Sequence, residues 1–191
     1  MTFARQAFKK LMEEHALKTD VDVDLSSGGK SRYYIDCRAV SMTYQGRGLI
    51  SEIGEEIMSE ELQELCPDGI GGVAVGGIPI AMAMADGEDV FIIRPSAKQH
   101  GLGKEIEGAD HLIGKQVVIV EDTVTTGKSL KKSLNAAAEF GLKPILAISL
   151  VTRTEGAVPS SFPVVLNGYT SFAVPYRTVL VAREPGILSI M

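Results

Sequence analysis

The sequence predicts an α/β fold in which a mostly parallel, twisted sheet is flanked by helices and carries a small N-terminal hood of one helix and antiparallel strands. Two observations lead to this prediction. Short apolar segments without polar alternation, typical of strands buried on both faces, recur along the chain at 70–75, 90–93, 117–120 and 145–151. Stretches with helical spacing of apolar side chains separate these segments, and strands that alternate with helices form parallel sheets.

The N-terminal region predicts one helix followed by two short strands. Residues 3–17 carry apolar side chains at helical spacing with Lys and Glu on the other face, as an amphipathic helix does. Residues 20–25 (DVDVDL) alternate strictly between polar and apolar, which is typical of a half-buried strand. A Ser- and Gly-containing turn at 26–30 leads to a second strand at 32–36, so we expect an antiparallel pair outside the main sheet.

The next part of the chain predicts a long helix, a strand and a short helix. Apolar side chains recur at helical spacing over residues 48–65, and Pro67-Asp68-Gly69 ends that helix. Strand 70–75 leads through a glycine turn to a helix with Pro79 near its first turn. Although residues 69–85 carry no charge, their five glycines and one proline would weaken a membrane-spanning helix, so we predict no membrane span.

The second half of the chain continues the alternation and then becomes irregular. The elements predicted after Asp86-Gly87 are a strand at 90–93, a long loop at 95–113, a strand at 117–120, a helix at 129–140 and a strand at 145–151. We expect the segment 95–113 to be a long mobile loop, and loops of that length are usually functional or disordered. Beyond Glu155, Pro159, Pro163 and Pro175 interrupt the pattern, and only 164–166 and 178–181 are strand-like.

Composition limits the possible functions of this chain. With 45% apolar and 23% charged residues, the chain can bury a core, and we expect one domain over residues 1–191, with a hood at roughly 1–45 and a core at roughly 46–191. The net charge of −5 argues against a nucleic-acid partner but not against a small phosphorylated ligand. Cys37 and Cys66 form no CxxC pair and the N-terminus shows no signal peptide, so we expect reduced thiols and a cytoplasmic protein.

The segment with the strongest indication of chemistry is VVIVEDTVTTGKS at 117–129. A buried strand leads to two carboxylates, Glu121 and Asp122, and a turn rich in hydroxyl groups then opens a helix. Ligands of open α/β sheets bind beyond the carboxyl ends of strands, and a helix N-terminus offers free N–H groups that suit a phosphate. The two acids suit the hydroxyl groups of a sugar, or a magnesium ion held with that sugar. The expected ligand is therefore a phosphorylated ribose.

Two other phosphate-binding motifs fit this chain poorly. Gly127-Lys128-Ser129 resembles the end of a Walker A loop, but Asp122 occupies the position of the first glycine, where a carboxylate would repel phosphate. The run from Gly71 to Gly77 lacks the GxGxxG spacing of a dinucleotide-binding turn.

The segment VVIVEDTVTTG at 117–127 resembles the ribose-phosphate loop of the type I phosphoribosyltransferases, which use 5-phosphoribosyl 1-diphosphate (PRPP). Three further segments narrow the resemblance to the orotate phosphoribosyltransferases within that family. LSSGGKSRYYIDCR at 25–38 resembles their hood, GVAVGGIPIA at 72–81 their pyrophosphate loop, and RPSAKQHGLGKEIEG at 94–108 their mobile catalytic loop. The resemblance covers roughly residues 25–155, in the same order and spacing.

This resemblance implies an activity, a cofactor and a partner. The reaction would transfer the 5-phosphoribosyl group of PRPP to orotate, giving orotidine 5-phosphate and pyrophosphate, in de novo pyrimidine biosynthesis. The cofactor would be Mg²⁺, held mainly by PRPP and near Glu121 and Asp122. The protein would be a homodimer that shares the catalytic loop across its interface, with no nucleic-acid or membrane partner.

The resemblance also implies roles for individual residues. Glu121 and Asp122 would hold the ribose hydroxyls, Thr125 and Arg153 would contact orotate, and Tyr34 and Ile35 would cover the base. The PRPP 5-phosphate would lie in a cradle made by Thr123, Val124, Thr125, Thr126, Gly127, Lys128 and Ser129. The pyrophosphate would be contacted by Gly76 and Gly77 and, from the neighbouring subunit, by the catalytic residues Arg94, Lys98 and His100.

Three positions depart from the pattern of that family. Pro95 stands where a Lys usually follows the loop arginine, and Ser26 and Gly76 stand where some members have Lys. Because these changes remove cations, two alternatives stay open: a PRPP- or nucleotide-sensing regulator on the same fold, or a phosphoribosyltransferase for another base such as a purine. No basic helix-turn-helix precedes residue 20, which counts against a regulator that binds DNA.

Overall fold

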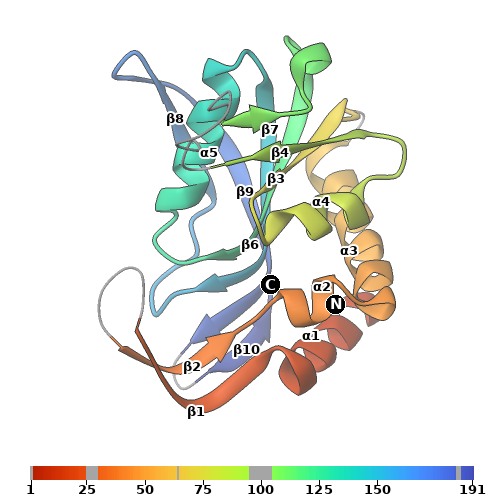
Figure 1. Cartoon of the computed structure of the whole chain (residues 1–191), viewed down its shortest axis with the longest axis vertical. Coiled ribbons are helices and arrows are strands. Elements are labelled where there is room, and N and C mark those ends of the chain that lie inside the picture. The colour runs from red at the N-terminus through yellow and green to blue at the C-terminus, as the bar shows by residue number, and fades with distance from the viewer. Residues whose placement is uncertain (1, 25–29, 64, 95–104, 184–185) are drawn as a thin grey trace.

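The computed structural model describes residues 2–24, 30–63, 65–94, 105–183 and 186–191 (Figure 1). Its helices are α1 (Phe3–His15), α2 (Arg38–Ser41), α3 (Tyr44–Leu62), α4 (Gly77–Met84) and α5 (Lys128–Glu139), with a 3₁₀ turn at Asp110–Leu112. Its strands are β1 (Leu17–Asp24), β2 (Lys30–Ile35), β3 (Gly69–Val73), β4 (Asp89–Ile93), β5 (Ile106–Glu107), β6 (Gln116–Val124), β7 (Lys143–Arg153), β8 (Ser161–Leu166), β9 (Tyr169–Arg183) and β10 (Ile187–Ile190). None of the described helices has the length and apolar character needed to cross a membrane.

The main sheet confirms the predicted α/β class. Its strand order is β10-β9-β7-β6-β3-β4-β5, with β8 paired to β9. The central pairs β9–β7, β7–β6, β6–β3 and β3–β4 are parallel, and only the pairs made by β5, β8 and β10 are antiparallel. The carboxyl ends of β3, β6 and β7 therefore meet at one edge of the sheet, where ligands bind in open α/β folds.

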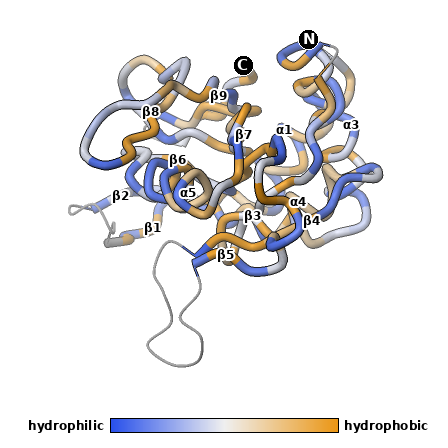
Figure 2. Tube along the Cα trace, turned by 90° about the horizontal axis from the view of Figure 1, so that it is seen from above, coloured by the Kyte–Doolittle hydropathy of each residue, from blue (hydrophilic) through white to orange (hydrophobic). Residues whose placement is uncertain are grey.

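The core lies on both faces of this sheet, with α1, α3 and α4 on one face and α5 and β8 on the other (Figure 1). Successive residues of β6 are divided between the two: Val118 and Val120 pack with the first set of helices, and Val117 and Ile119 pack toward α5. Because a strand presents alternate side chains to opposite faces, a strand covered on both sides must be apolar throughout. Figure 2 shows this as hydrophobic chain along the inner strands.

The N-terminal hood is the predicted helix and antiparallel pair. Strands β1 and β2 form a separate two-stranded sheet, and α1 packs on α3 and β10. Along β2 the side chains of Ser31, Tyr33 and Ile35 are buried, while alternate residues are more exposed. Gly186, which precedes β10, fits against the ring of Tyr33, and a Cβ there would lie 3.1 Å from the Tyr33 Cβ atom. The buried face of β2 is therefore turned toward the main domain.

The structure differs from the sequence prediction mainly after residue 121 and in the C-terminal region. β6 continues through Glu121 and Asp122 to Val124, because β7 pairs with it as far as Thr152. The proline-interrupted region forms two long strands and β10 follows them, although no third strand is expected from the sequence. Pro175 is tolerated inside β9 because the strand changes partner there: residues up to Pro175 pair with β8, and residues from Tyr176 pair with β7. Within 95–113, residues 106–107 form β5 and residues 110–112 a 3₁₀ turn; the remainder of the predicted mobile loop, 95–104, lies outside the described residues.

Candidate active site

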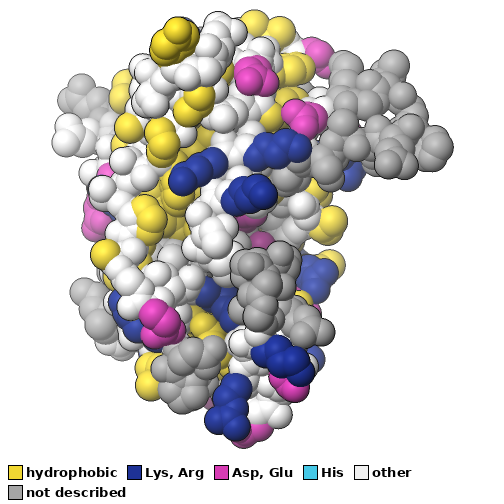
Figure 3. Space-filling model, turned by 90° about the vertical axis from the view of Figure 1, so that its left-hand side faces the viewer, with side chains coloured by type: hydrophobic (Ala, Val, Ile, Leu, Met, Phe, Trp, Pro, Cys, Tyr) yellow, Lys and Arg dark blue, Asp and Glu magenta, His cyan; other side chains and the backbone are white. Residues whose placement is uncertain are grey.

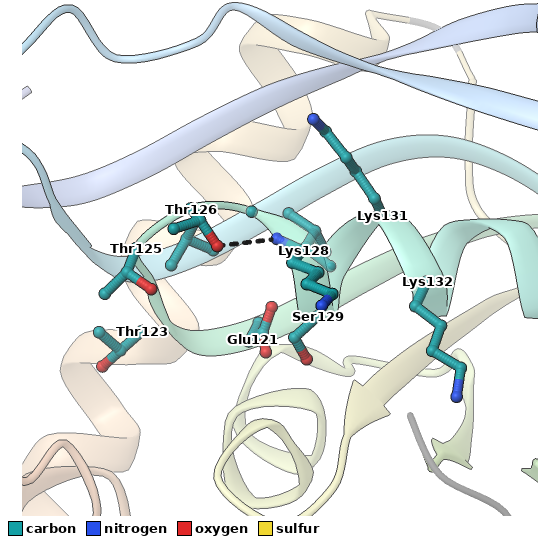
Figure 4. A pocket seen from close by; sticks show the side chains of 11 residues that line it. Glu121, Thr123, Thr125, Thr126, Lys128, Ser129, Lys131 and Lys132 are labelled. Atoms are coloured by element: carbon teal, nitrogen blue, oxygen red, sulfur yellow. Dashed lines mark hydrogen bonds between the residues drawn. The ribbon is translucent and has the colours of Figure 1, made fainter. Parts of the chain in front are cut away.

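A cleft of about 760 Å³ lies where β6 ends and α5 begins (Figure 4). The turn at 125–127 joins the two elements, and Gly127 adopts a left-handed conformation (φ +71°) as the N-cap of α5. A side chain at this position would be strained, so glycine is required for the turn to open the helix. Thr125, Thr126 and Lys128 are exposed at the rim, and the Lys128 N–H lies 3.4 Å from the Thr126 hydroxyl oxygen. The turn thus presents hydroxyl and N–H donors to the cleft, as expected for a phosphate cradle.

Of the two acidic residues near the end of β6, Glu121 lines this cleft, and Asp122, the next residue along the strand, packs against the β3–α4 turn. Glu121 is 7% exposed, and among the described residues its Oε2 atom has no hydrogen-bond partner. Figure 4 shows Glu121 beside Ser129, which belongs to the first turn of α5. Asp122 accepts a 2.7 Å hydrogen bond from the Thr123 N–H at Oδ1. A buried oxygen without a partner is costly unless a ligand satisfies it, so this site suits a hydroxyl donor or a cation.

Burial shifts the titration of both carboxyl groups. It raises the pKa of Glu121 from 4.5 to about 7, with the Ser129 hydrogen bond opposing the shift and Asp122 adding to it. Burial also raises the pKa of Asp122, while the Thr123 N–H and the positive charge of Arg38 act in the opposite direction. Glu121 therefore changes charge near neutral pH.

We expect Glu121 to make the free protein less stable as pH rises. A carboxyl group whose pKa is raised in the native state holds its proton more tightly there than in the unfolded chain. The shift from 4.5 to about 7 corresponds to a loss of about 3 kcal/mol in the free energy of unfolding, spread across that pH window. Urea denaturation should show that the free energy of unfolding falls less between pH 5 and pH 8 for Glu121→Gln than for the native chain. Equal losses in both proteins would contradict the prediction.

The turn between β3 and α4 packs directly against Asp122 and the backbone of β6. A Cβ atom on Gly76 would lie 2.0 Å from Oδ2 of Asp122, and one on Gly77 would lie 2.5 Å from the carbonyl oxygen of Val120. Both distances are too short for any side chain, so the two glycines allow the turn to approach the end of β6. The structure therefore brings the predicted pyrophosphate turn next to the predicted ribose-binding carboxylates.

Arg153, at the end of β7, is held by the hood. Its guanidinium carbon lies 4.5 Å from the centre of the Tyr33 ring, Nε donates to the Tyr33 hydroxyl oxygen at 3.3 Å, and Nη2 donates to the Ser31 hydroxyl oxygen at 2.9 Å. Cation–π contact and two hydrogen bonds fix the plane of the arginine. The neighbouring strand residues Tyr34 and Ile35 are half-buried and buried, respectively.

The two cysteines are free, and they differ in their surroundings. Cys37 is buried behind the cleft, with Sγ 3.4 Å from the Thr123 hydroxyl oxygen and 3.7 Å from the Asp122 carbonyl oxygen. Burial raises the pKa of the Cys37 thiol to about 12. Cys66 is exposed, near the C-terminal end of α3.

The predicted catalytic loop is described only at its ends. Arg94 follows β4, and its Nε atom makes an ion pair with Glu107 Oε1 at 2.6 Å. Lys98 and His100, like Pro95 and Ser26, lie outside the described residues, so their predicted roles stay predictions. Within the described part of the chain, no three His, Cys, Asp or Glu side chains form a metal-binding group.

Sequence reasoning missed two lysines at the cleft and the tyrosine that holds Arg153. Lys131 and Lys132 line the cleft together with the turn, three and four residues after Lys128 on the same side of α5. Residues three and four positions apart lie on the same side of a helix, so this spacing could have identified both lysines from the sequence. Figure 3, which views the molecule from the α5 side, shows Lys and Arg side chains gathered on this face. Tyr33, which holds Arg153, could not be distinguished from its neighbour Tyr34 by sequence.

Comparison with known proteins relates this chain to enzymes that use phosphoribosyl groups. Residues 44–175 match the phosphoribosyl transferase domain. The orotate phosphoribosyltransferase of Corynebacterium glutamicum (strain R) is 35% identical over 96% of this chain and 95% of its own length, and that of Aquifex aeolicus (strain VF5) is 37% identical over 80% and 85%. Among solved structures, Mycobacterium tuberculosis H37Rv orotate phosphoribosyltransferase in complex with PRPP superposes with a TM-score of 0.62 at 28% identity, covering 81% of this chain and 86% of that one. The adenine phosphoribosyltransferase of Saccharomyces cerevisiae (TM-score 0.63, 15% identity, 91% and 98% covered) shares the fold alone.

Proposed function

The chain belongs to the phosphoribosyl transferase family and, within it, to the orotate phosphoribosyltransferases, and from that premise we propose how its cleft performs the reaction. The enzyme transfers the 5-phosphoribosyl group of PRPP to orotate and releases pyrophosphate. The observation that carries the proposal is one continuous segment, β6 to α5, which combines a buried carboxylate at Glu121 and a half-buried one at Asp122 with a turn of exposed donors. The two ends of a phosphorylated ribose need these two kinds of group.

PRPP would lie along this segment with its 5-phosphate at the helix. Thr123, Val124 and the turn through Ser129 would cradle the phosphate. They line the cleft at the N-terminus of α5, where hydroxyl groups and free N–H groups can donate hydrogen bonds to a phosphate. Glu121 and Asp122 would accept hydrogen bonds from the ribose hydroxyls. The unpartnered Oε2 atom of Glu121 supports this assignment, since a ribose hydroxyl would satisfy it.

Orotate would lie between the end of β7 and the hood. Arg153 is a planar fork that matches a carboxylate, and its contacts with Tyr33 and Ser31 support a fixed orientation for the remaining donors. Thr125 would contact the base from the phosphate turn, and Tyr34 and Ile35 would cover it. A base without a carboxylate would leave the N–H donors of Arg153 that face the base without an acceptor.

The pyrophosphate would leave across the β3–α4 turn, beside Gly76 and Gly77. Breaking the bond from the ribose C1 atom to the pyrophosphate develops positive charge on the sugar and negative charge on the leaving group. Asp122 lies close to this turn and would favour the positive sugar, while Arg94, Lys98 and His100 would stabilise the negative charge of the pyrophosphate. Bound Mg²⁺ would neutralise part of the pyrophosphate charge; the carboxylates of Glu121 and Asp122 are ligands of the kind it prefers.

The decisive assay is base specificity with PRPP and Mg²⁺. We expect PRPP consumption by the full chain to depend on orotate and to yield orotidine 5-phosphate and pyrophosphate in equal amounts. Consumption with a purine instead would contradict the proposed base. Tight binding of PRPP without turnover of any base would favour a sensing regulator.

The proposed assembly is a cytoplasmic homodimer that shares the catalytic loop between subunits, and subunit mixing tests it. Lys98→Ala and Asp122→Asn should each be inactive. The first variant lacks the lysine that each subunit would contribute to its partner's site, and the second lacks the acid that would bind ribose in its own site. An equal mixture exchanged by mild denaturation should recover about a quarter of native activity, since half of the dimers then contain one intact site. No recovery, with exchange verified by mass, would contradict a shared site.

A further inference from the structure

Phe162, on β8, lies directly behind the phosphate turn, in a region to which the sequence assigned no function. Its side chain is 3% exposed. A Cβ atom placed on Gly127 would lie 2.4 Å from Cε1 and 2.8 Å from Cζ of this ring. The ring is therefore in van der Waals contact with the backbone of the residue that caps α5 and completes the turn.

The Phe162 ring is itself held from the core. Tyr176, on β9, meets it edge-on, with ring centres 4.9 Å apart and planes at 69°. The Tyr176 hydroxyl is hydrogen-bonded to the side chains of Ser149 and Thr152 on β7. Aromatic pairs favour this edge-to-face arrangement, and a buried tyrosine hydroxyl with two partners has little freedom to move. The ring is thus wedged between a rigid hydroxyl cluster and the turn.

Two further contacts join this ring and its strand to α5. Nζ of Lys131 lies 5.6 Å from the centre of the Phe162 ring, which keeps this lysine at the wall of the cleft. On the same strand, the Val165 N–H donates a 3.0 Å hydrogen bond to the Asn135 side chain. β8 is therefore attached to α5 both at its first turns and farther along the helix.

Resting on the proposed function, we infer that Phe162 is a positioning residue for the PRPP 5-phosphate. Its ring sets the distance between the core and the Gly127 backbone and so fixes the N–H groups that bind the phosphate. Removing the ring would leave space behind the turn, into which the backbone could move. The 5-phosphate does not react, so this contact should contribute equally to binding of the substrate and of the transition state.

The test compares Phe162→Leu with Phe91→Leu in the full chain. Phe91 is a matched control because it is 1% exposed and belongs to the same apolar cluster, but lies on β4 against Gly69 and Gly71. For Phe162→Leu we expect the KM for PRPP to rise about tenfold with kcat within about twofold of native, as a loss of uniform binding requires. Affinity for ribose 5-phosphate should fall to the same extent, and affinity for pyrophosphate with Mg²⁺ should not change.

An unchanged KM for PRPP in Phe162→Leu, or an equal rise in Phe91→Leu, would overturn the inference. Should Phe162→Leu not fold, Phe162→Met replaces the ring with an unbranched, flexible side chain that fills irregular core space, and the same comparison of the two half-ligands applies. Equal loss of ribose 5-phosphate and pyrophosphate binding would also overturn it, since that indicates general damage. A native chain that neither binds nor consumes PRPP would refute the proposed function instead.

Discussion

Arg153→Ala should lower kcat/KM for orotate by about 100-fold, because loss of a charge-assisted, two-point contact with a carboxylate costs about 3 kcal/mol. The KM for PRPP, measured in the forward reaction with PRPP varied at saturating orotate, should change little, since the phosphate turn follows β6 whereas Arg153 ends β7. Arg153→Lys should recover only part of the loss, because an ammonium group keeps the charge but cannot reproduce the planar fork held by Tyr33. The measurement is steady-state kinetics with orotate varied at saturating PRPP.

A suitable control for this change is Arg177→Ala. Arg177 is also a half-buried arginine at the sheet and is ion-paired to Glu61 at 2.6 Å, but it lies on β9, outside the proposed orotate site. Arg177→Ala should lower the free energy of unfolding and leave kcat/KM for orotate unchanged. A native rate with orotate in Arg153→Ala would show that another group recognises the carboxylate and would reopen the assignment of the base.

Gly76→Ala is expected to weaken PRPP binding by about 100-fold or more, since a misplacement of about 1 Å in a binding group has effects of this size. The new Cβ atom would lie 2.0 Å from Oδ2 and 2.3 Å from Cγ of Asp122. Either the carboxylate must rotate away from the ribose, or the β3–α4 turn must withdraw from the pyrophosphate. Isothermal titration of PRPP with Mg²⁺ measures the loss directly.

Gly48→Ala is the matched control for that substitution. Gly48 is exposed within α3, and a Cβ there meets no atom within 4 Å. Alanine is favoured over glycine inside a helix, so this variant should bind PRPP normally and unfold with about 0.5–1 kcal/mol more free energy. Normal PRPP binding by Gly76→Ala would show that the turn and Asp122 can move apart without cost.

The contact between Gly76 and Asp122 also concerns one of the positions at which this sequence departs from the family pattern. Where some members of the family carry Lys, this chain has glycine, and the sequence alone presents that as a lost cation. In the structure the space of a side chain at this position is occupied by the Asp122 carboxylate. A lysine here would therefore require Asp122 to adopt another position.

The features that the sequence predicted well are those determined by local pattern. β6 and β7 could be found because strands covered on both faces need unbroken apolar runs, and the acid pair stood out because charge follows such a run immediately. The family followed from the resemblance of the same segment and the orotate reaction from that of three further segments, and the comparisons confirm both.

The features that could not be predicted depend on contacts between distant parts of the chain. The sequence separates Tyr33 from Arg153 by 120 positions, and periodicity cannot say which of two adjacent tyrosines faces inward. The continuation of β9 past Pro175 depends on an exchange of strand partners, and β8 supports the phosphate turn only through packing of Phe162 on Gly127. Such contacts require the assembled sheet.

The contrast between Cys37 and Cys66 makes this enzyme convenient for spectroscopic work. With a pKa of about 12 and no access to solvent, Cys37 holds almost no thiolate at neutral pH, so a maleimide dye offered to the folded protein should attach at Cys66 alone. A fluorophore placed there would require no engineered cysteine, and a second modified site would report unfolding around Thr123.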